Sequence, residues 1–91
     1  MKITIKKAFL KDLQNVNEPQ KSQVKLFLES INEDVSTLDS SLYDIKKLQG
    51  DTKGNFFRLR FGNYRLGYEK KDDEIVISRI LHRRDIYRSF P

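Results

Sequence analysis

Cysteine is absent from the 91 residues, and histidine occurs once, as His82. The absence of cysteine excludes disulfide bonds, a thiol nucleophile and a thiolate metal site. A single histidine cannot build a histidine metal cluster, so we expect no metal and no cofactor. The sequence also shows no paired carboxylates of the glycosidase kind, no glycine-rich phosphate loop and no serine–histidine–aspartate pattern.

Long hydrophobic runs are also missing. No stretch approaches the roughly 20 apolar residues that a transmembrane helix needs. The N-terminal stretch MKITIKKAFLKDL is too charged, and its apolar run too short, for a signal peptide. We therefore expect a cytoplasmic protein that does not bind a membrane. Its 91 residues suffice for one domain with its own core, spanning 1–91.

Arginine is missing from the first half of the chain. Residues 1–52 contain eight lysines and eight acidic residues, so this half is neutral. Residues 53–91 contain three lysines, seven arginines and five acidic residues, and they hold the whole net charge of +5. Arginine binds phosphate and carboxylate through two parallel hydrogen bonds. This concentration indicates recognition of such an anion, and a solvated basic face is the alternative.

The stretch Phe56–Tyr68, FFRLRFGNYRLGY, predicts a β-hairpin. Gly62-Asn63 forms a two-residue loop with glycine first, which suits a type II′ turn. A turn of this length fixes the cross-strand pairs, which are Phe61 with Tyr64, Arg60 with Arg65, Leu59 with Leu66, Arg58 with Gly67 and Phe57 with Tyr68. The apolar pairs share one face, and we interpret Tyr64 and Tyr68 as core residues.

The other face of this hairpin carries arginine. Arg60 lies directly opposite Arg65, with Arg58 beside them, and like charges in that position repel. A neighbouring carboxylate or an anionic ligand must compensate. Because no run of acidic residues is placed to do so, we favour phosphate, or a protein that mimics it.

The remaining elements complete an α+β domain. Alternation predicts strands at 1–6 and 74–81, and helical spacing of apolar residues predicts helices at about 7–16 and 18–32. We expect Asn17 to cap the second helix, a loop at 33–41, an approach segment at 43–48 and turns at Gly50-Asp51 and 70–73. Residues 82–90 form a helical turn or a tail. The predicted order is β-α-α-β-β-β, with two N-terminal helices packed on a twisted, mainly antiparallel sheet.

The C-terminal run His82–Arg88, HRRDIYR, adds groups able to act on RNA. Cleavage by an internal 2′-hydroxyl needs a base, cations for the charge on the phosphate oxygens and an acid for the leaving 5′-oxygen. Histidine is the side chain whose ordinary pKa lies nearest to neutrality, which makes His82 a candidate for proton transfer. Tyr87 lies four residues after Arg83, on the same side of a helical turn, and could transfer a proton or stack on a base.

Each of these residues also has a structural interpretation. His82 at a strand end could be purely structural, and the ring of Tyr87 could pack under the sheet. Arg84 and Arg88 could be surface residues that face Asp85. Arg79, within the last strand, could pair with Asp72 or Glu74.

These motifs together resemble one family. The segments KLQG at Lys47–Gly50, FRLRFGNYRLGYE, an acidic turn, a β-branched strand and LHRRDIYR resemble the RelE toxins of the RelE/ParE superfamily. The match covers residues 43–88, whereas the N-terminal half agrees only in element order. RelE-like toxins are the toxin halves of bacterial and archaeal toxin–antitoxin pairs, and their architecture is similar to that of microbial ribonucleases.

The resemblance implies a metal-independent endoribonuclease. Such toxins cleave mRNA, typically in the ribosomal A site, leaving a 2′,3′-cyclic phosphate and a 5′-hydroxyl. By position, the implied catalytic residues are Arg65 and Arg83 for charge stabilisation and His82 or Tyr87 for proton transfer. The implied RNA- and phosphate-binding residues are Lys53, Arg58, Arg60 and Arg84. The sequence ends at Pro91, without the longer C-terminal helix of some members, which would leave the groove open to an antitoxin.

Three hypotheses follow. The first is an mRNA endoribonuclease whose partners are mRNA, the ribosome and a cognate antitoxin that neutralises it. This antitoxin is expected to be small, with acidic or apolar segments that cover the basic groove. The second is a ParE-like toxin that poisons DNA gyrase by protein contact, which His82 and Tyr87 disfavour. The third is a basic RNA-binding module without catalysis.

Overall fold

The computed structural model describes residues 1–39, 42–48 and 55–91 of the chain. The predicted turn at Gly50-Asp51 and the predicted RNA-binding residue Lys53 lie outside these ranges. In the described ranges the elements are, in order, β1 (Lys2–Ile5), α1 (Lys7–Gln14), α2 (Gln20–Glu33), the 3₁₀-helix η1 (Val35–Asp39), β2 (Ile45–Lys47), β3 (Asn55–Phe61), β4 (Tyr64–Lys71), β5 (Glu74–His82) and α3 (Ile86–Ser89).

The strands form one twisted sheet in the order β1-β5-β4-β3-β2. Strands β2 to β5 pair in antiparallel fashion, whereas β1 lies parallel to β5. The predicted α+β class and mainly antiparallel sheet are therefore confirmed. The approach segment forms a further strand, β2, because its half-buried Ile45 pairs with the fully buried Leu59 of β3. The tail forms the short helix α3.

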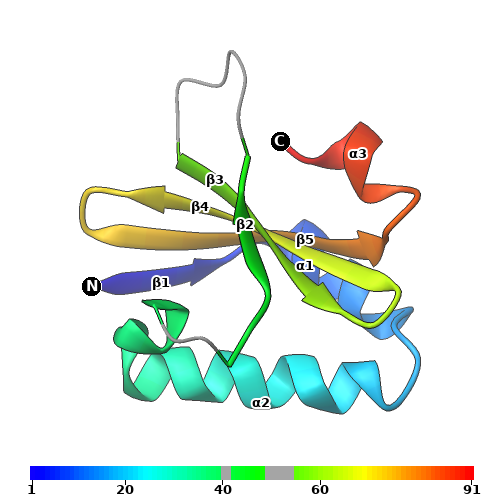
Figure 1. The fold of residues 1–91 in the computed structure, drawn as a ribbon, viewed down its shortest axis with the longest axis horizontal. Coiled ribbons are helices and arrows are strands. Elements are labelled where there is room, and N and C mark those ends of the chain that lie inside the picture. The colour runs from blue at the N-terminus through cyan, green and yellow to red at the C-terminus, as the bar shows by residue number, and fades with distance from the viewer. Residues whose placement is uncertain (40–41, 49–54) are drawn as a thin grey trace.

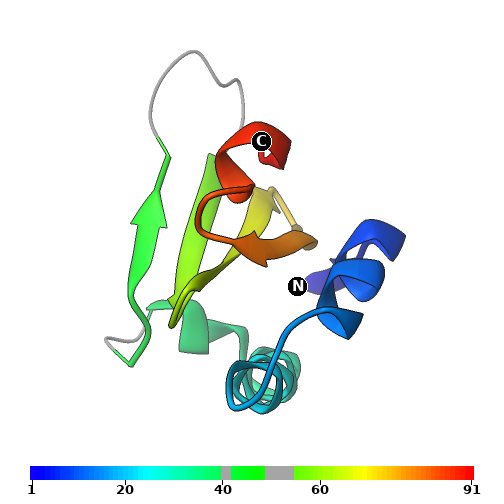
Figure 2. The same ribbon diagram turned by 90° about the vertical axis from the view of Figure 1, so that its right-hand side faces the viewer.

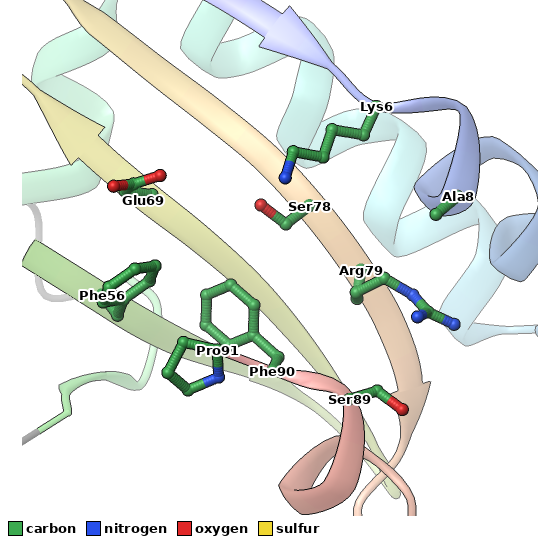
Figure 3. A pocket seen from close by; sticks show the side chains of 9 residues that line it. All are labelled: Lys6, Ala8, Phe56, Glu69, Ser78, Arg79, Ser89, Phe90 and Pro91. Carbon is green, nitrogen blue, oxygen red and sulfur yellow. The ribbon is translucent and has the colours of Figure 1, made fainter. Parts of the chain in front are cut away.

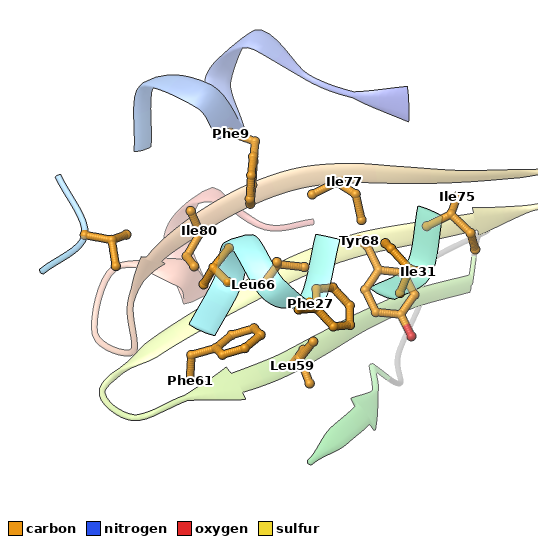
Figure 4. Close-up of a cluster of buried hydrophobic side chains, with 12 residues drawn as sticks. Phe9, Phe27, Ile31, Leu59, Phe61, Leu66, Tyr68, Ile75, Ile77 and Ile80 are labelled. Atoms are coloured by element: carbon orange, nitrogen blue, oxygen red, sulfur yellow. The ribbon is translucent and has the colours of Figure 1, made fainter. Parts of the chain in front are cut away.

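The core lies between the sheet and the two N-terminal helices. Helix α2 lies on one side of the sheet and α3 on the other, as Figures 1 and 2 show. The predicted apolar stripe of α2 is buried, and it meets inward residues of the strands in one cluster (Figure 4), which includes Phe9, Val24, Phe27, Ile31, Leu59, Leu66, Ile77 and Ile80. No helix in the described ranges is both long and apolar enough to cross a membrane.

The start of α2 differs from the prediction in its capping residue. The carboxylate of Glu18 accepts hydrogen bonds from the backbone amide and the hydroxyl of Ser22, at 2.9 and 2.8 Å. These bonds lower the pKa of Glu18. Asn17 contributes only its carbonyl, which accepts from the amide of Lys21. A glutamate side chain is long enough to reach this exposed amide from outside the helix, so it supplies the acceptor expected of Asn17.

The central hairpin has the predicted register. All five predicted cross-strand pairs are present, from Phe61 opposite Tyr64 to Phe57 opposite Tyr68. Gly62 has a φ of 58° while Asn63 does not have a positive φ, as a type II′ turn requires. Tyr68 is buried, and Tyr64 is half-buried and packs against the core cluster. The apolar face of the hairpin is thereby fixed, and its arginines must point the other way.

Arg79 pairs with neither of the two acids predicted for it. Its Nε and Nη2 donate to the two carboxylate oxygens of Asp12 in α1, at 2.7 and 3.0 Å. The amide of Ile80 donates to the same carboxylate at 3.1 Å. Glu74 lies five residues earlier on the same strand, which is roughly 16 Å away, whereas α1 packs directly on β5. Asp12 therefore joins α1 to β5.

Candidate functional site

Three arginines lie on the face of the sheet turned away from α1 and α2. Arg58 and Arg60 belong to β3, and Arg65 belongs to β4. Arg60 and Arg65 are direct cross-strand partners, and Arg58 lies opposite Gly67. Since successive side chains of a strand alternate between faces, the buried Leu59 and Leu66 force all three arginines onto this face.

These arginines share a hollow with a residue from the end of the chain. The hollow has a volume of ≈ 230 Å³ and is lined by Asp44, Lys46, Arg58, Arg60, Arg65 and Tyr87. We call it the arginine hollow. Tyr87 comes from α3, and the guanidinium carbon of Arg58 lies 4.2 Å from the centre of its ring. The phenol is 69% exposed, so the alternative that Tyr87 packs under the sheet is wrong.

Arg65 lines this hollow and is held by hydrogen bonds to the backbone of the hairpin turn. Its Nη1 donates to the carbonyl oxygens of Gly62 and Tyr64, at 2.9 and 3.0 Å. Burial, followed by the positive charge of Arg60, lowers the pKa of Arg65, and the charge of Arg83 acts in the same direction. The positive groups thus repel one another as the sequence predicted, and an anion placed among them would be stabilised.

Asp44 is the one carboxylate in the lining of the arginine hollow, and it partly offsets the positive charge there. It lines the hollow, and its negative charge acts on Arg65 to raise the pKa of the guanidinium. Among the described residues, however, no carboxylate lies within ion-pair distance of Arg58, Arg60 or Arg65. One exposed acid therefore faces three arginines and Lys46, which leaves the hollow positively charged.

The Nε of Arg58 is a second feature of the hollow that suits an anion. Its Nε is buried and has no hydrogen-bond partner in the described part of the chain. A buried donor without an acceptor costs free energy, so such groups are rare in folded proteins. An oxygen of a bound anion would satisfy it.

His82 lies apart from this hollow. It pairs across the sheet with Tyr64, and the two rings meet edge to face with centroids 6.2 Å apart. Its Nδ1 accepts a hydrogen bond of 3.2 Å from the amide of Arg84. Tyr64 is itself fixed, because its hydroxyl accepts from the amide of Asn17. This geometry favours the structural interpretation of His82, and the arginine hollow contains Tyr87 but not the histidine.

The turn after β5 brings a fourth arginine near the site. The amide of Arg83 donates to the carbonyl of Asn63 at 2.7 Å, which ties this turn to the tip of the hairpin. Arg83 is exposed, and its charge reaches Arg65. Arg84 is exposed as well. In the ranges that the structure describes, neither Arg84 nor Arg88 forms an ion pair with Asp85.

Sequence reasoning missed two residues of the hollow, Asp44 and Lys46. Both lie on or beside β2, and Lys46 pairs with Arg58 across the sheet. The signal was present, because Tyr43 and Ile45 alternate with these two charged residues, as in a half-buried strand. Where the chain is described, no group of three or more histidine, aspartate or glutamate side chains could hold a metal ion.

The chain is similar in sequence and in structure to toxins of known toxin–antitoxin systems. Residues 3–87 match the family model described as the ParE toxin of the type II toxin–antitoxin system parDE. The chain is 42% identical over 91 residues to the toxin RelE3 of Methanocaldococcus jannaschii, and the alignment covers 100% of both chains.

Solved structures show the same fold. The toxin–antitoxin complex RelB–RelE from Methanococcus jannaschii contains a chain with a TM-score of 0.80 and 36% identity, which covers 97% of this chain and 99% of that one. A chain of the archaeal RelE–RelB complex from Pyrococcus horikoshii has a TM-score of 0.69 and 24% identity, with coverages of 90% and 93%. The YafQ structure from E. coli has a TM-score of 0.70 at 20% identity, with coverages of 93% and 96%.

Proposed function

Because this chain belongs to the RelE/ParE superfamily of type II toxin–antitoxin toxins, we propose that it is an endoribonuclease that cleaves mRNA in the ribosomal A site. The observation that carries the proposal is the arginine hollow. Three arginines and a tyrosine converge there, and the Nε of Arg58 lacks a partner among the described residues. A phosphodiester supplies the negative charge and the acceptor oxygens that such a hollow lacks.

The proposed reaction is a transfer within the RNA. The 2′-oxygen bonds to the adjacent phosphorus while the bond from phosphorus to the 5′-oxygen breaks. The products are a 2′,3′-cyclic phosphate and a 5′-hydroxyl. One proton leaves the 2′-hydroxyl and one reaches the 5′-oxygen, so the step consumes no water. Arginine side chains, in place of a metal ion, stabilise the charge on the phosphate oxygens.

We assign each residue a role in this reaction from its place in or near the hollow. Arg65, fixed by its two carbonyl contacts, stabilises the charge that develops on the phosphate oxygens, with Arg83 beside it. Arg58 and Arg60 bind the phosphate, and Lys53 and Arg84 bind flanking RNA. Of the two candidates for proton transfer, Tyr87 lines the hollow and His82 does not, so we assign this role to Tyr87.

The proposed protein partner is a cognate antitoxin. Similar chains have been solved in complex with RelB antitoxins. An acidic or apolar segment laid over the arginine hollow would satisfy the same groups as RNA. Since the proposed substrate is mRNA on ribosomes, the proposed location of the toxin is the cytoplasm.

A second candidate function is ParE-like inhibition of DNA gyrase, favoured by the family model itself, which describes ParE toxins. The two functions differ in what they damage. A gyrase poison acts through contact with a protein and breaks DNA, and it has no use for a phenol beside convergent arginines.

Expression in cells separates the candidates. We expect the chain to arrest growth and to generate in-frame mRNA cuts, detected by mapping transcript 5′ ends. Arg65→Ala should abolish both effects. Lys25→Ala, which removes one positive charge from an exposed position on α2, should leave both unchanged. Growth arrest with intact mRNA and broken DNA would overturn the proposal in favour of gyrase inhibition, and absence of toxicity would favour binding without catalysis.

A further inference from the structure

The end of the chain is anchored on the arginine face of the sheet. Helix α3 packs against β5, with Ile86 fully buried, and Phe90 beyond the helix is only 4% exposed. Figure 3 looks into the pocket beside this tail and shows Phe90 lying across the strands next to Phe56. The two rings meet edge to face, with centroids 5.6 Å apart.

A glycine in β4 creates the seat for Phe90. A Cβ atom added to Gly67 would lie 2.5 Å from Cδ2 and 2.6 Å from Cγ of the phenylalanine ring. No real side chain fits at such distances, so only glycine leaves room. Glycine inside a strand weakens it and often marks a place where another group approaches closely. Here that group is the ring of Phe90.

This anchor determines where Tyr87 lies. Helix α3 has four residues, too few to be stable alone. The amide of Phe90 donates to the carbonyl of Ile86 at 2.9 Å, so the two buried side chains bracket the helical turn. Tyr87 lies between them with most of its surface exposed, and its described ring contact is with Arg58. Among the described residues, no second ring contact helps to hold it over the hollow.

We propose that Phe90, seated on Gly67, is a positioning residue that holds α3 so that Tyr87 stays over Arg58 in the arginine hollow. Phe90 does not line that hollow, so it would act on the reaction through the position of Tyr87 and not by touching the RNA. The activity test of this inference rests on the proposed ribonuclease function. The contact between Tyr87 and Arg58 can be measured whether or not the chain is a ribonuclease.

The first test is the rate of single-turnover cleavage of ribosome-bound mRNA. Phe90→Ala should lower the rate roughly 10- to 100-fold, because a small misplacement of a catalytic group has effects of this size. Phe90→Leu, which keeps much of the apolar contact, should recover most of the rate. The matched control is Phe57→Ala, since Phe57 is a β3 aromatic stacked on Tyr68 on the opposite face, at 5.0 Å. It should lose stability and retain near-normal cleavage below its melting temperature.

A double-mutant cycle tests whether Phe90 acts through Tyr87. In a Tyr87→Ala background, Phe90→Ala should cause little further loss, because coupled residues are not additive. An undiminished effect in that background would overturn the positioning role. If Phe57→Ala lowered the cleavage rate as much as Phe90→Ala, the positioning role would also be overturned, because general destabilisation would then explain both.

The second test is NMR spectroscopy of the free chain. Nuclear Overhauser effects between the Tyr87 ring protons and the δ-methylene of Arg58 should be present in the wild type and in Phe57→Ala. They should be lost in Phe90→Ala and in Gly67→Ala, where the added methyl group displaces the phenylalanine ring. Their retention in Phe90→Ala would overturn this inference. Failure of the wild-type chain to cleave mRNA would instead overturn the proposed function.

Discussion

At the scale of single residues, the arginine hollow contains one phenol and no imidazole. Tyr87 lies against Arg58, whereas His82 packs on Tyr64 and accepts a hydrogen bond from the backbone. The sequence could not choose between the two, because His82 ends β5 and Tyr87 follows it by only five residues. The choice depends on the direction in which α3 leaves the sheet, and this direction is set by the burial of Ile86 and Phe90.

We therefore predict different results for these two residues. Tyr87→Phe keeps the ring and removes only the hydroxyl, so it should lower the cleavage rate roughly 10²-fold if the phenol transfers a proton. His82→Gln should lower it less than tenfold. Single-turnover cleavage of ribosome-bound mRNA measures both. If Tyr87→Phe cleaves normally and Tyr87→Ala does not, the tyrosine stacks on a base and transfers no proton.

Tyr68 makes folding stability depend on alkaline pH. Burial, together with the charge of Asp39, raises the pKa of Tyr68 to about 12, against about 10 for an exposed tyrosine. The unfolded chain then releases this proton at lower pH than the folded chain. Stability that is present below pH ~10 is therefore lost as the pH rises from about 10 to about 12.

The free energy of unfolding, measured with urea at several pH values, checks this effect. Over that range it should fall by roughly 1–3 kcal/mol more in the wild type than in Tyr68→Phe, which lacks the titrating group. Parallel pH profiles for the two proteins would show that Tyr68 does not titrate differently in the folded state.

At the scale of elements, the hairpin was predictable and the helix contacts were not. A two-residue turn and strict alternation determine every pair from Phe57 to Tyr68, so local chemistry is enough. The partner of Arg79 was wrongly predicted, because Asp12 is far away in sequence and meets β5 only when α1 packs on the sheet. Asp44 and Lys46 were not predicted as site residues for the same reason, because only the pairing of β2 with β3 brings them into the hollow.

Asp12 is predicted to stabilise the junction of α1 and β5. Its carboxylate accepts from two guanidinium nitrogens of Arg79 and from the amide of Ile80. Asp12→Ala leaves these part-buried donors without an acceptor, and should lower the free energy of unfolding by about 1–3 kcal/mol. Asp85→Ala, at an exposed position, should change it by less than about 0.5 kcal/mol. Equal effects in urea denaturation would mean that Asp12 contributes no specific contact.

For the molecule as a whole, the uneven distribution of charge along the sequence places the arginines on one face of the sheet. The neutral N-terminal half supplies α1 and α2, and the basic half supplies β3, β4 and the tail. The sequence thus predicted which half supplies the arginines of the hollow, and anion binding there stays a prediction. It could not show that the tail returns over β4, because that depends on the fit between Phe90 and Gly67.

Binding to single-stranded RNA should therefore weaken with salt. If the three arginines of the hollow each neutralise a phosphate, the logarithm of the binding constant should fall against the logarithm of salt concentration with a slope of about −2. Arg58→Ala should make this slope less steep by about 0.7. Lys2→Ala removes a charge from β1, at the opposite edge of the sheet, and should leave the slope unchanged. Identical slopes for all three proteins would place the RNA elsewhere.

In the proposed function, the arginine hollow and Tyr87 cleave mRNA by attack of the 2′-hydroxyl. The most direct measurement is to mix the purified chain with ribosomes holding a defined mRNA and to analyse the ends of the products. We expect fragments with a 2′,3′-cyclic phosphate and a 5′-hydroxyl, formed at a codon in the A site and absent with Arg65→Ala. Intact mRNA, or fragments that carry a 5′-phosphate, would contradict it.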